Sequence, residues 1–243
     1  MTGERFLRAF HAGRPGVTSQ AFARGGSYAR LAARIAPGAR VLDLACGDGA
    51  LLAHLDERAV GPRAVGIDVS IDELRTLTRT AQARAQALPF ADHSFDVVAC
   101  HLAFMLFDEL PQVVAELERV LVPGGELLAV LGGGPTADGD DAFHRFLAIL
   151  DQGPSQAPRL GDRRARSEPG WRELMPGWQH EPFERWQLDL GGRFDEVWKV
   201  LGSSYELGTR ANAIRDALRA SCGEHVPCSV VMYLARATTP RTQ

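Results

Sequence analysis

Short apolar runs alternate with amphipathic segments along the first half of the chain. The runs that predict buried strands are residues 39–45, 63–69, 94–100 and 126–134, with a weaker one at 82–86. The segments with helical spacing of apolar side chains are residues 51–59, 71–81 and 107–121. Ser70 and Glu73 have the spacing of a capping box at the start of the second of these helices. Strands that alternate with helices predict right-handed crossovers and a mainly parallel sheet with helices on both faces.

The second half of the chain has a different pattern. Prolines punctuate residues 135–182, within which residues 140–150 form one amphipathic segment. Residues 183–190 and 228–237 then predict two final strands. We therefore expect one domain over residues 1–243. Its predicted parts are an N-terminal cover (1–36), a ligand-binding core (37–134), a lid insertion (135–182), and C-terminal strands and helices (183–243).

The stretch Val41 to Gly49, "VLDLACGDG", places a glycine turn directly after a strand. Gly47 and Gly49 allow the backbone to approach a ligand closely, and Asp43 stands near the end of the strand. A dinucleotide-binding turn needs a third glycine, but Leu52 occupies that position. The pattern of a P-loop is absent as well. The missing glycine thus counts against a dinucleotide ligand, and the missing pattern excludes a P-loop.

Asp68 stands at the end of the second predicted strand. A carboxylate at this place can accept hydrogen bonds from the two hydroxyls of a ribose. A glycine turn followed by such an aspartate indicates a ligand that contains adenosine.

Four segments together resemble the successive motifs of class I S-adenosylmethionine-dependent methyltransferases. They are "VLDLACGDGALLAHL", "AVGIDVS", "AQALPFADHSFDVVAC" and "ELERVLVPGGELLAVL". The likeness is greatest to the small-molecule branch that includes the ubiquinone and menaquinone methyltransferases, and it covers residues 39–131 well. It implies an α/β fold, a three-layer Rossmann-like sheet of seven strands with an N-terminal helical cover and a lid after strand five. It also implies S-adenosylmethionine as the cofactor.

The resemblance assigns cofactor roles to particular positions of this chain. The backbone from Ala45 to Gly49 would pass the methionine and ribose part, and Asp68 would bind the ribose with Val69 against adenine. His101, after the fourth strand, would line the methionine end, and Tyr28 would reach the cofactor carboxylate. The full predicted set is Tyr28, Asp43, Ala45, Gly47, Gly49, Asp68, Val69, Ala85, Gln86 and His101.

One position departs from the family pattern. Members often read "DAExLPF", where the aspartate accepts a hydrogen bond from the adenine amino group, whereas this chain reads "RAQALPF". Arg84 therefore takes the place of the aspartate, and arginine has no acceptor. We expect the Ala85 backbone to contact the ring and Gln86 to supply an acceptor.

Methyl transfer needs alignment of acceptor and donor, and a general base helps when the acceptor is a hydroxyl or an acidic carbon. The candidates for such a base are His101, His144, Tyr205 and His11. A packing or solvated role remains open for each of them, as it does for the late aromatic residues that could form a substrate wall.

Composition narrows the remaining classes. The formal net charge of −3 gives no basic face for nucleic acid, and the cysteines show no zinc spacing, so no metal is expected. No apolar run reaches the length of a signal peptide or a membrane span, which predicts a cytoplasmic protein.

The sequence thus predicts methylation of a small molecule, such as a bacterial secondary metabolite of natural product biosynthesis or a quinone-like compound. One alternative is a methyltransferase fold that uses the bound cofactor in a non-methylating cyclisation or pericyclic step. A nicotinamide-dependent oxidoreductase is a further alternative, and the missing third glycine counts against it.

Overall fold

A computed structural model of the protein describes residues 3–12, 14–58, 60–137, 139–153, 160–205 and 207–241. The α-helices are α1 (Gly3–His11), α2 (Val17–Phe22), α3 (Ser27–Ala32), α4 (Ala50–Asp56), α5 (Ile71–Leu74), α6 (Leu110–Val120), α7 (Ala142–Asp151), α8 (Glu168–Leu174), α9 (Phe194–Ser203) and α10 (Ala211–Ala220). Short 3₁₀ turns are η1 (Ala23–Gly25), η2 (Gly61–Arg63), η3 (Phe104–Leu106), η4 (Arg163–Arg166) and η5 (Gly208–Arg210). The strands are β1 (Val41–Leu44), β2 (Ala64–Asp68), β3 (Thr80–Gln82), β4 (Phe95–His101), β5 (Leu121–Gly134), β6 (Gln179–His180), β7 (Glu184–Asp189), β8 (Gly192–Arg193), β9 (His225–Val226) and β10 (Ser229–Thr238).

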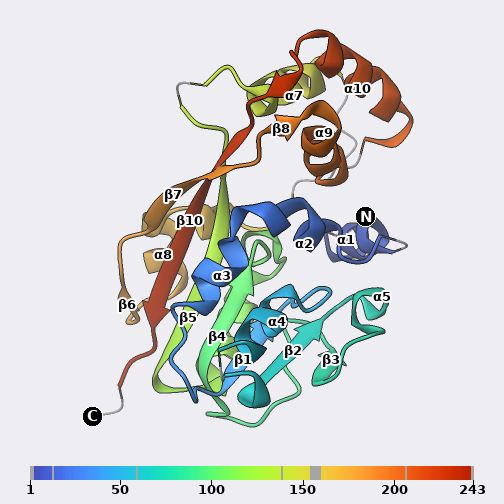
Figure 1. Ribbon diagram of the computed structural model, residues 1–243. Helices are drawn as coiled ribbons and strands as arrows, with labels where there is room; N and C mark the ends of the chain where they lie inside the picture. Colours follow the sequence, from blue (N-terminus) through green and yellow to red (C-terminus); the bar gives the residue numbers. More distant parts are fainter. Residues whose placement is uncertain are drawn as a thin grey trace.

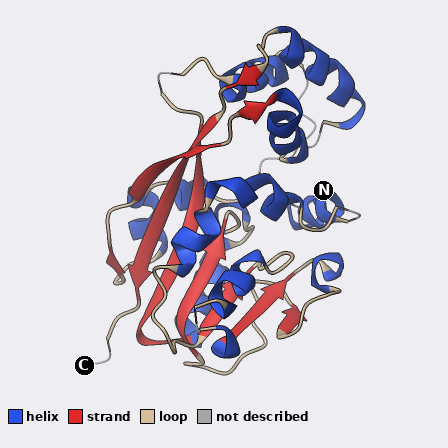
Figure 2. Cartoon of the chain, in the orientation of Figure 1, coloured by secondary structure: helices blue, strands red, loops and turns tan. Residues whose placement is uncertain are grey.

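A single large sheet runs through the molecule in the order β3-β2-β1-β4-β5-β10-β6, with β7 also paired to β10 (Figure 2). The first five strands in this order are parallel, and β10 is antiparallel to β5. β6 and β7 pair with successive parts of the same edge of β10, so eight strands fill seven positions. The predicted α/β fold with a seven-stranded, largely parallel sheet is thereby confirmed.

Alternate residues of the central strands belong to two hydrophobic cores, one on each face of the sheet. Val97 and Ala99 of β4 belong to the core that includes side chains of α3 and α4. Val98 and Cys100 belong to the core that includes side chains of α6 and α8. Because neighbouring strand side chains point to opposite faces, a nearly continuous apolar run is what a strand buried on both faces requires.

The segment after β2 differs from its prediction. The helix expected over residues 71–81 ends at Leu74, and residues 80–82 form β3 at the sheet edge, just before the strand expected at 82–86. The chain leaves the helix early because Thr80–Gln82 pairs with Gly66–Asp68 and satisfies the backbone of β2. The predicted capping box is also wrong, since the Ser70 side chain makes no cap and Glu73 bonds elsewhere.

The N-terminal helices lie across the ends of the parallel strands, and a second group of helices lies farther out (Figure 1). This outer group contains α7, α9 and α10, and the long strands β5 and β10 lead to it. Helix α2 packs against α9, which joins the two groups. Among the helices of the described residues, none is long and apolar enough to cross a membrane.

Candidate cofactor site

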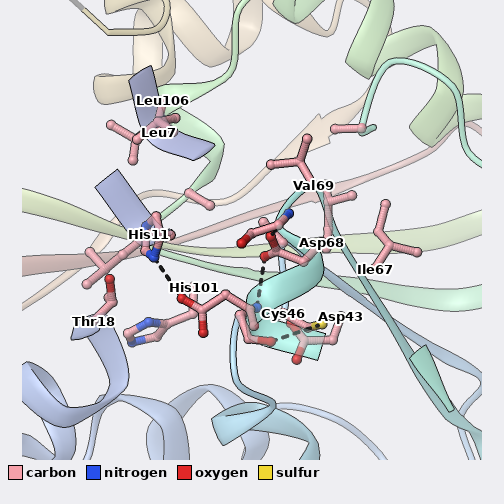
Figure 3. A pocket seen from close by; sticks show the side chains of 18 of the residues that line it. Leu7, His11, Thr18, Asp43, Cys46, Ile67, Asp68, Val69, His101 and Leu106 are labelled. Carbon is pink, nitrogen blue, oxygen red and sulfur yellow. Dashed lines mark hydrogen bonds and ion pairs between the residues drawn. The ribbon is translucent and has the colours of Figure 1, made fainter. Parts of the chain in front are cut away.

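A pocket opens at the carboxyl ends of β1, β2 and β4 (Figure 3). The strand order reverses here, because β2 lies on one side of β1 and β4 on the other. Open α/β sheets bind ligands at such a switch point. All described residues that line the pocket lie between Glu4 and Asp108.

The glycine turn forms the floor of the pocket. Ala45 (φ 60°), Gly47 (φ 53°) and Gly49 (φ 82°) all have left-handed backbone. Ala45 and Gly47 line the pocket, and a Cβ on Gly47 would have no protein atom within 4 Å. Gly49 is not among the lining residues. It begins α4, and a Cβ there would lie 2.9 Å from Leu77 Cδ2. Gly47 therefore leaves room for a ligand, whereas Gly49 leaves room for Leu77.

Asp68 ties the turn to the end of β2. Its Oδ2 accepts a hydrogen bond from the Gly47 N–H at 2.9 Å, and its Oδ1 accepts one from the Ser70 N–H at 2.8 Å. Burial raises the pKa of Asp68, while these two backbone donors act in the opposite direction. Each carboxylate oxygen has a second lone pair, so a fixed carboxylate here can still accept bonds from two hydroxyls of a ligand.

Asp43 is the most deeply buried carboxyl group of the pocket, with 1% of the residue exposed. Its Oδ2 has no hydrogen-bond partner among the described residues. Burial raises the pKa of Asp43 well above its usual value, and the nearby Asp68 and Asp48 raise it further. A buried acceptor without a donor is costly, so this group points to a ligand that brings a donor or a positive charge.

The charge of the lining supports the same conclusion. Among the described residues that line the pocket, only Arg84 carries a permanent positive charge. The carboxyl groups are those of Glu4, Asp43, Asp48, Asp68, Glu73 and Asp108. This excess of acidic groups favours a cationic ligand over a phosphate.

The N-terminal cover is held over the pocket by buried and partly buried acidic groups. Glu73, 4% exposed, accepts a hydrogen bond from the Gly16 N–H and pairs with His11 Nδ1, each at 2.8 Å (Figure 3). The Ser19 hydroxyl donates to Asp48 at 2.5 Å. Glu73 thus fastens the segment between α1 and α2 instead of capping its own helix.

Tyr28 and His101 stand together at the methionine end predicted from the sequence. Burial lowers the pKa of His101 to about 3, which leaves a neutral imidazole. The His101 Nε2 shares a 2.9 Å hydrogen bond with the buried Ser27 hydroxyl, whereas its Nδ1 has no partner in the part of the chain that the structure describes. Burial, and next the charge of Asp48, raise the pKa of Tyr28. Both side chains are therefore uncharged surfaces of the pocket at neutral pH.

The opposite end of the pocket contains Val69, Ala85, Gln86 and the unusual Arg84. The Arg84 guanidinium is paired with Glu4 of α1 at 2.7 Å. The Gln86 amide nitrogen donates to the Asp108 carbonyl at 2.8 Å, so its amide oxygen is the acceptor that it can offer.

The structure brings together every predicted cofactor residue except Gly49. Of the four candidate bases, His101 and His11 line the pocket. His144 does not, because its ring bonds Asp141 and the Thr136 carbonyl at the start of α7. Tyr205 packs edge-to-face on Phe146, with ring centroids 5.1 Å apart. The late aromatic residues are absent from the described lining, and Trp171 of α8 lies within the core.

Four acidic residues of the pocket escaped the sequence reasoning. Glu4, Asp48, Glu73 and Asp108 lie in amphipathic or polar segments where acidic side chains are ordinary. The position of Asp48 could have indicated its role, because it lies inside the glycine turn itself. The position of Glu73 was instead interpreted as part of a helix cap. The described residues contain no cluster of His, Cys, Asp and Glu side chains arranged to hold a metal ion.

The fold and the site define a Rossmann-like domain of the class I methyltransferase type. Residues 42–129 match the family model of the methyltransferase domain. This match and the fold imply S-adenosylmethionine as the cofactor. The pocket fits this group, since it supplies an unpartnered carboxylate, an open glycine turn and acidic walls.

Curated relatives have the same core. A demethylmenaquinone methyltransferase of Thermus thermophilus is 41% identical over 101 residues, which cover 37% of this chain and 46% of that protein. A malonyl-acyl-carrier-protein O-methyltransferase of Coxiella burnetii is 34% identical over 122 residues, which cover 46% of this chain and 43% of that protein. The chain therefore spans less than half the length of either relative.

Solved structures resemble a larger part of the chain. A putative methyltransferase of Bacillus halodurans has a TM-score of 0.59 at 20% identity, covering 89% of this chain and 100% of that one. The cyclase SpnF has a TM-score of 0.54 at 20% identity, covering 88% and 80%. At this identity the likeness establishes the fold alone.

Proposed function

We propose that the protein transfers a methyl group from S-adenosylmethionine to an apolar small molecule. The observation that carries the proposal is Asp43, a buried carboxyl group with an unpartnered oxygen among other acidic groups. When bound, S-adenosylmethionine supplies an electrophilic methyl group on a positively charged sulfur, and it also carries an ammonium group. Asp43 and its acidic neighbours stabilise such a cation in the pocket.

In this proposal the protein binds and aligns the donor. Asp68 accepts hydrogen bonds from the ribose hydroxyls. The open space beside Gly47 lets the ligand lie directly against the backbone. Tyr28 and His101 wall the methionine end as neutral rings. Alignment of an acceptor with the methyl group is the main contribution that such an enzyme makes to the rate.

The proposed acceptor is apolar and quinone-like, or a secondary metabolite of natural product biosynthesis. The pocket has an apolar wall, formed by Leu7, Leu102 and Phe107. One relative is named as a methyltransferase of demethylmenaquinone, which is a quinone. Since His101 is a weak base, we assign proton removal, where an acceptor needs it, to His11, which Glu73 holds at the pocket.

The expected lid over residues 135–182 remains part of the proposal, and residues 138 and 154–159 of it lie outside the described residues. No described residue of this segment lines the cofactor pocket. We place the acceptor at the apolar wall of that pocket, under the N-terminal cover.

Titration calorimetry with S-adenosylmethionine and S-adenosylhomocysteine tests the cofactor assignment. Asp68→Ala should weaken both by about tenfold or more, because two charge-assisted hydrogen bonds are lost. Asp72→Ala is the matched control, since Asp72 pairs with Arg75 nearby and does not line the pocket. Equal affinities for Asp68→Ala and the wild type would refute the ribose assignment.

A non-methylating reaction is the second candidate, favoured by the fold that the chain has in common with the cyclase SpnF. Incubation with demethylated naphthoquinols and related phenols separates the two. Methyl transfer forms S-adenosylhomocysteine in equal amount to product, whereas a cyclisation leaves the cofactor unchanged.

A further inference from the structure

In the proposed cofactor site, the adenine lies beside a residue that follows β3. That residue has no hydrogen-bond acceptor to offer to the adenine amino group. With the ribose at Asp68 on β2, the base extends away from β1 and toward the exit of β3. The adenine amino group is a hydrogen-bond donor, and burying it without an acceptor weakens binding. The residue at that exit is Arg84, which has donors only.

Arg84 is instead turned to acidic partners. Its Nε lies 2.7 Å from Glu4 Oε2, and its NH2 lies 3.5 Å from Glu109 Oε2. The arginine therefore serves to hold the first turn of α1 against the pocket. Another group must then recognise the base, and the described lining offers the Gln86 amide oxygen and the Asp108 carboxylate. The carboxylate is the stronger acceptor of the two.

Asp108 is the carboxylate that the structure brings to this place. It follows β4 in the chain, yet its carbonyl accepts the 2.8 Å bond from Gln86, two residues beyond Arg84. Its Oδ2 accepts a bond from the Glu4 N–H at 3.2 Å and so caps α1. Asp108 and Gln86 both line the pocket.

Gly3 makes room for this carboxylate. A Cβ on Gly3 would lie 2.8 Å from Asp108 Oδ1 and 2.9 Å from Oδ2. The start of α1 is thus shaped around the Asp108 side chain. Gln86, through its amide nitrogen, fixes the backbone from which that side chain extends.

We propose that the Asp108 carboxylate accepts the hydrogen bond from the adenine amino group, in place of the strand-end residue 84. The inference rests on the proposed S-adenosylmethionine site. Gln86 is then a positioning residue for Asp108. Because the same carboxylate caps α1, recognition of adenine also seats the N-terminal cover.

The test compares S-adenosylhomocysteine with S-inosylhomocysteine, in which a carbonyl acceptor replaces the amino donor and N1 carries a hydrogen. Calorimetry gives the two dissociation constants. Because two ring positions differ, the change of their ratio on substituting Asp108, and not the ratio alone, reports on the carboxylate. The wild type should bind the inosine form about tenfold or more weakly. Asp108→Asn offers a donor as well as an acceptor, so the ratio should fall several-fold.

The ratio separates recognition from a structural role. A variant that merely loosens α1 weakens both ligands alike and leaves the ratio unchanged. Glu109→Gln is the matched control, because it removes a neighbouring negative charge outside the pocket lining and should retain the wild-type ratio. Gly3→Ala is a second variant that keeps Asp108 itself but displaces its carboxylate, and it should lower the ratio.

The outcomes are distinct. A wild-type ratio preserved in both Asp108→Asn and Gly3→Ala would overturn the inference and leave the proposed function intact. Failure of the wild-type protein to bind either ligand would overturn the proposed function, and the inference with it.

Discussion

The Tyr28 ring stacks on the His101 imidazole, with centroids 3.7 Å apart and planes inclined by 22°. The contact joins α3 of the cover to the end of β4, where the His101 ring is buried and the Tyr28 ring is partly buried. An imidazole stacked and bonded in this way has little water to solvate a charge. The pair therefore links the cover to the sheet through the uncharged form of His101.

The first prediction follows from the protonation of His101. An unfolded histidine takes up a proton near pH 6.5, whereas burial lowers the pKa of folded His101 to about 3. The neutral His101 ring therefore contributes fully to the stability of the fold above the pKa of the unfolded state. This contribution is lost progressively as the pH falls from that pKa toward the folded pKa. At about pH 4.5 the loss is on the order of 2 kcal/mol.

His101→Phe keeps an aromatic ring stacked on Tyr28 but removes the group that takes up the proton. Its free energy of unfolding in urea should change less than that of the wild type between about pH 7 and about pH 4.5. An identical pH dependence in the two proteins would show that the imidazole is protonated in the folded state.

A second prediction concerns the charge of the cofactor. Burial raises the pKa of Asp43 and of Asp68, so a cationic ligand binds better once these carboxyl groups have lost their protons. The affinity for S-adenosylmethionine should therefore rise between about pH 5 and about pH 7, more steeply than that for S-adenosylhomocysteine, which lacks the sulfonium charge.

Calorimetry at the two pH values measures this difference, and Asp43→Asn should reduce it. In the free protein, Asp43→Asn also removes the cost of ionising a buried group, a cost that grows as the pH rises above the ordinary carboxyl pKa. Parallel pH profiles for the two ligands in the wild type would exclude a role for these carboxylates in binding the sulfonium.

A third prediction distinguishes the two glycines of the turn. Alanine in left-handed backbone costs about 1–2 kcal/mol. Gly47→Ala incurs this cost and places a methyl group where the ligand would lie. Gly49→Ala incurs it and also meets Leu77 at 2.9 Å.

Gly47→Ala should consequently lose more cofactor affinity, and Gly49→Ala should lose more stability. Thermal unfolding and calorimetry on the same preparations check both, and each variant serves as the control of the other. The reverse order in either measurement would contradict the assignment of Gly49 to packing.

A fourth prediction addresses the hold of Glu73 on the cover. Glu73→Ala removes the bonds to His11 and to the Gly16 N–H. Amide hydrogens of α2 should then exchange faster by about tenfold or more, because an anchor worth on the order of 1–2 kcal/mol is lost.

Hydrogen exchange read by mass spectrometry measures the change, with α6 as an internal reference. Glu57→Ala is the control variant, since Glu57 is exposed and pairs with His54, away from the cover. Unchanged exchange in Glu73→Ala would show that other contacts hold the segment.

Much of the fold could be predicted because strands buried on both faces are mostly apolar. The runs at 94–100 and 126–134 have this property and form β4 and most of β5. The helix over 71–81 was predicted wrongly because periodicity continues past Leu74, while pairing with β2 decides the structure. Local pattern does not contain that tertiary contact.

The candidate site divides in a similar way. Gly47 and Asp68 belong to a contiguous turn and a strand end, so their pattern is visible in the sequence. Asp108 becomes a neighbour of Gln86 only when β4 and β3 are placed in one sheet. Glu73 likewise reaches His11 across 62 positions of the chain.

The pocket takes its described lining entirely from Glu4 to Asp108, before β5 begins. The chain is thus arranged so that a single crossover after Gly134 could exchange the outer helices by recombination. Such a chimera would inherit every described lining residue of the cofactor pocket. The incoming segment must preserve its β10 edge, which pairs with β5 from Glu126 to Gly134, and the surface of α9 that packs against α2 of the cover.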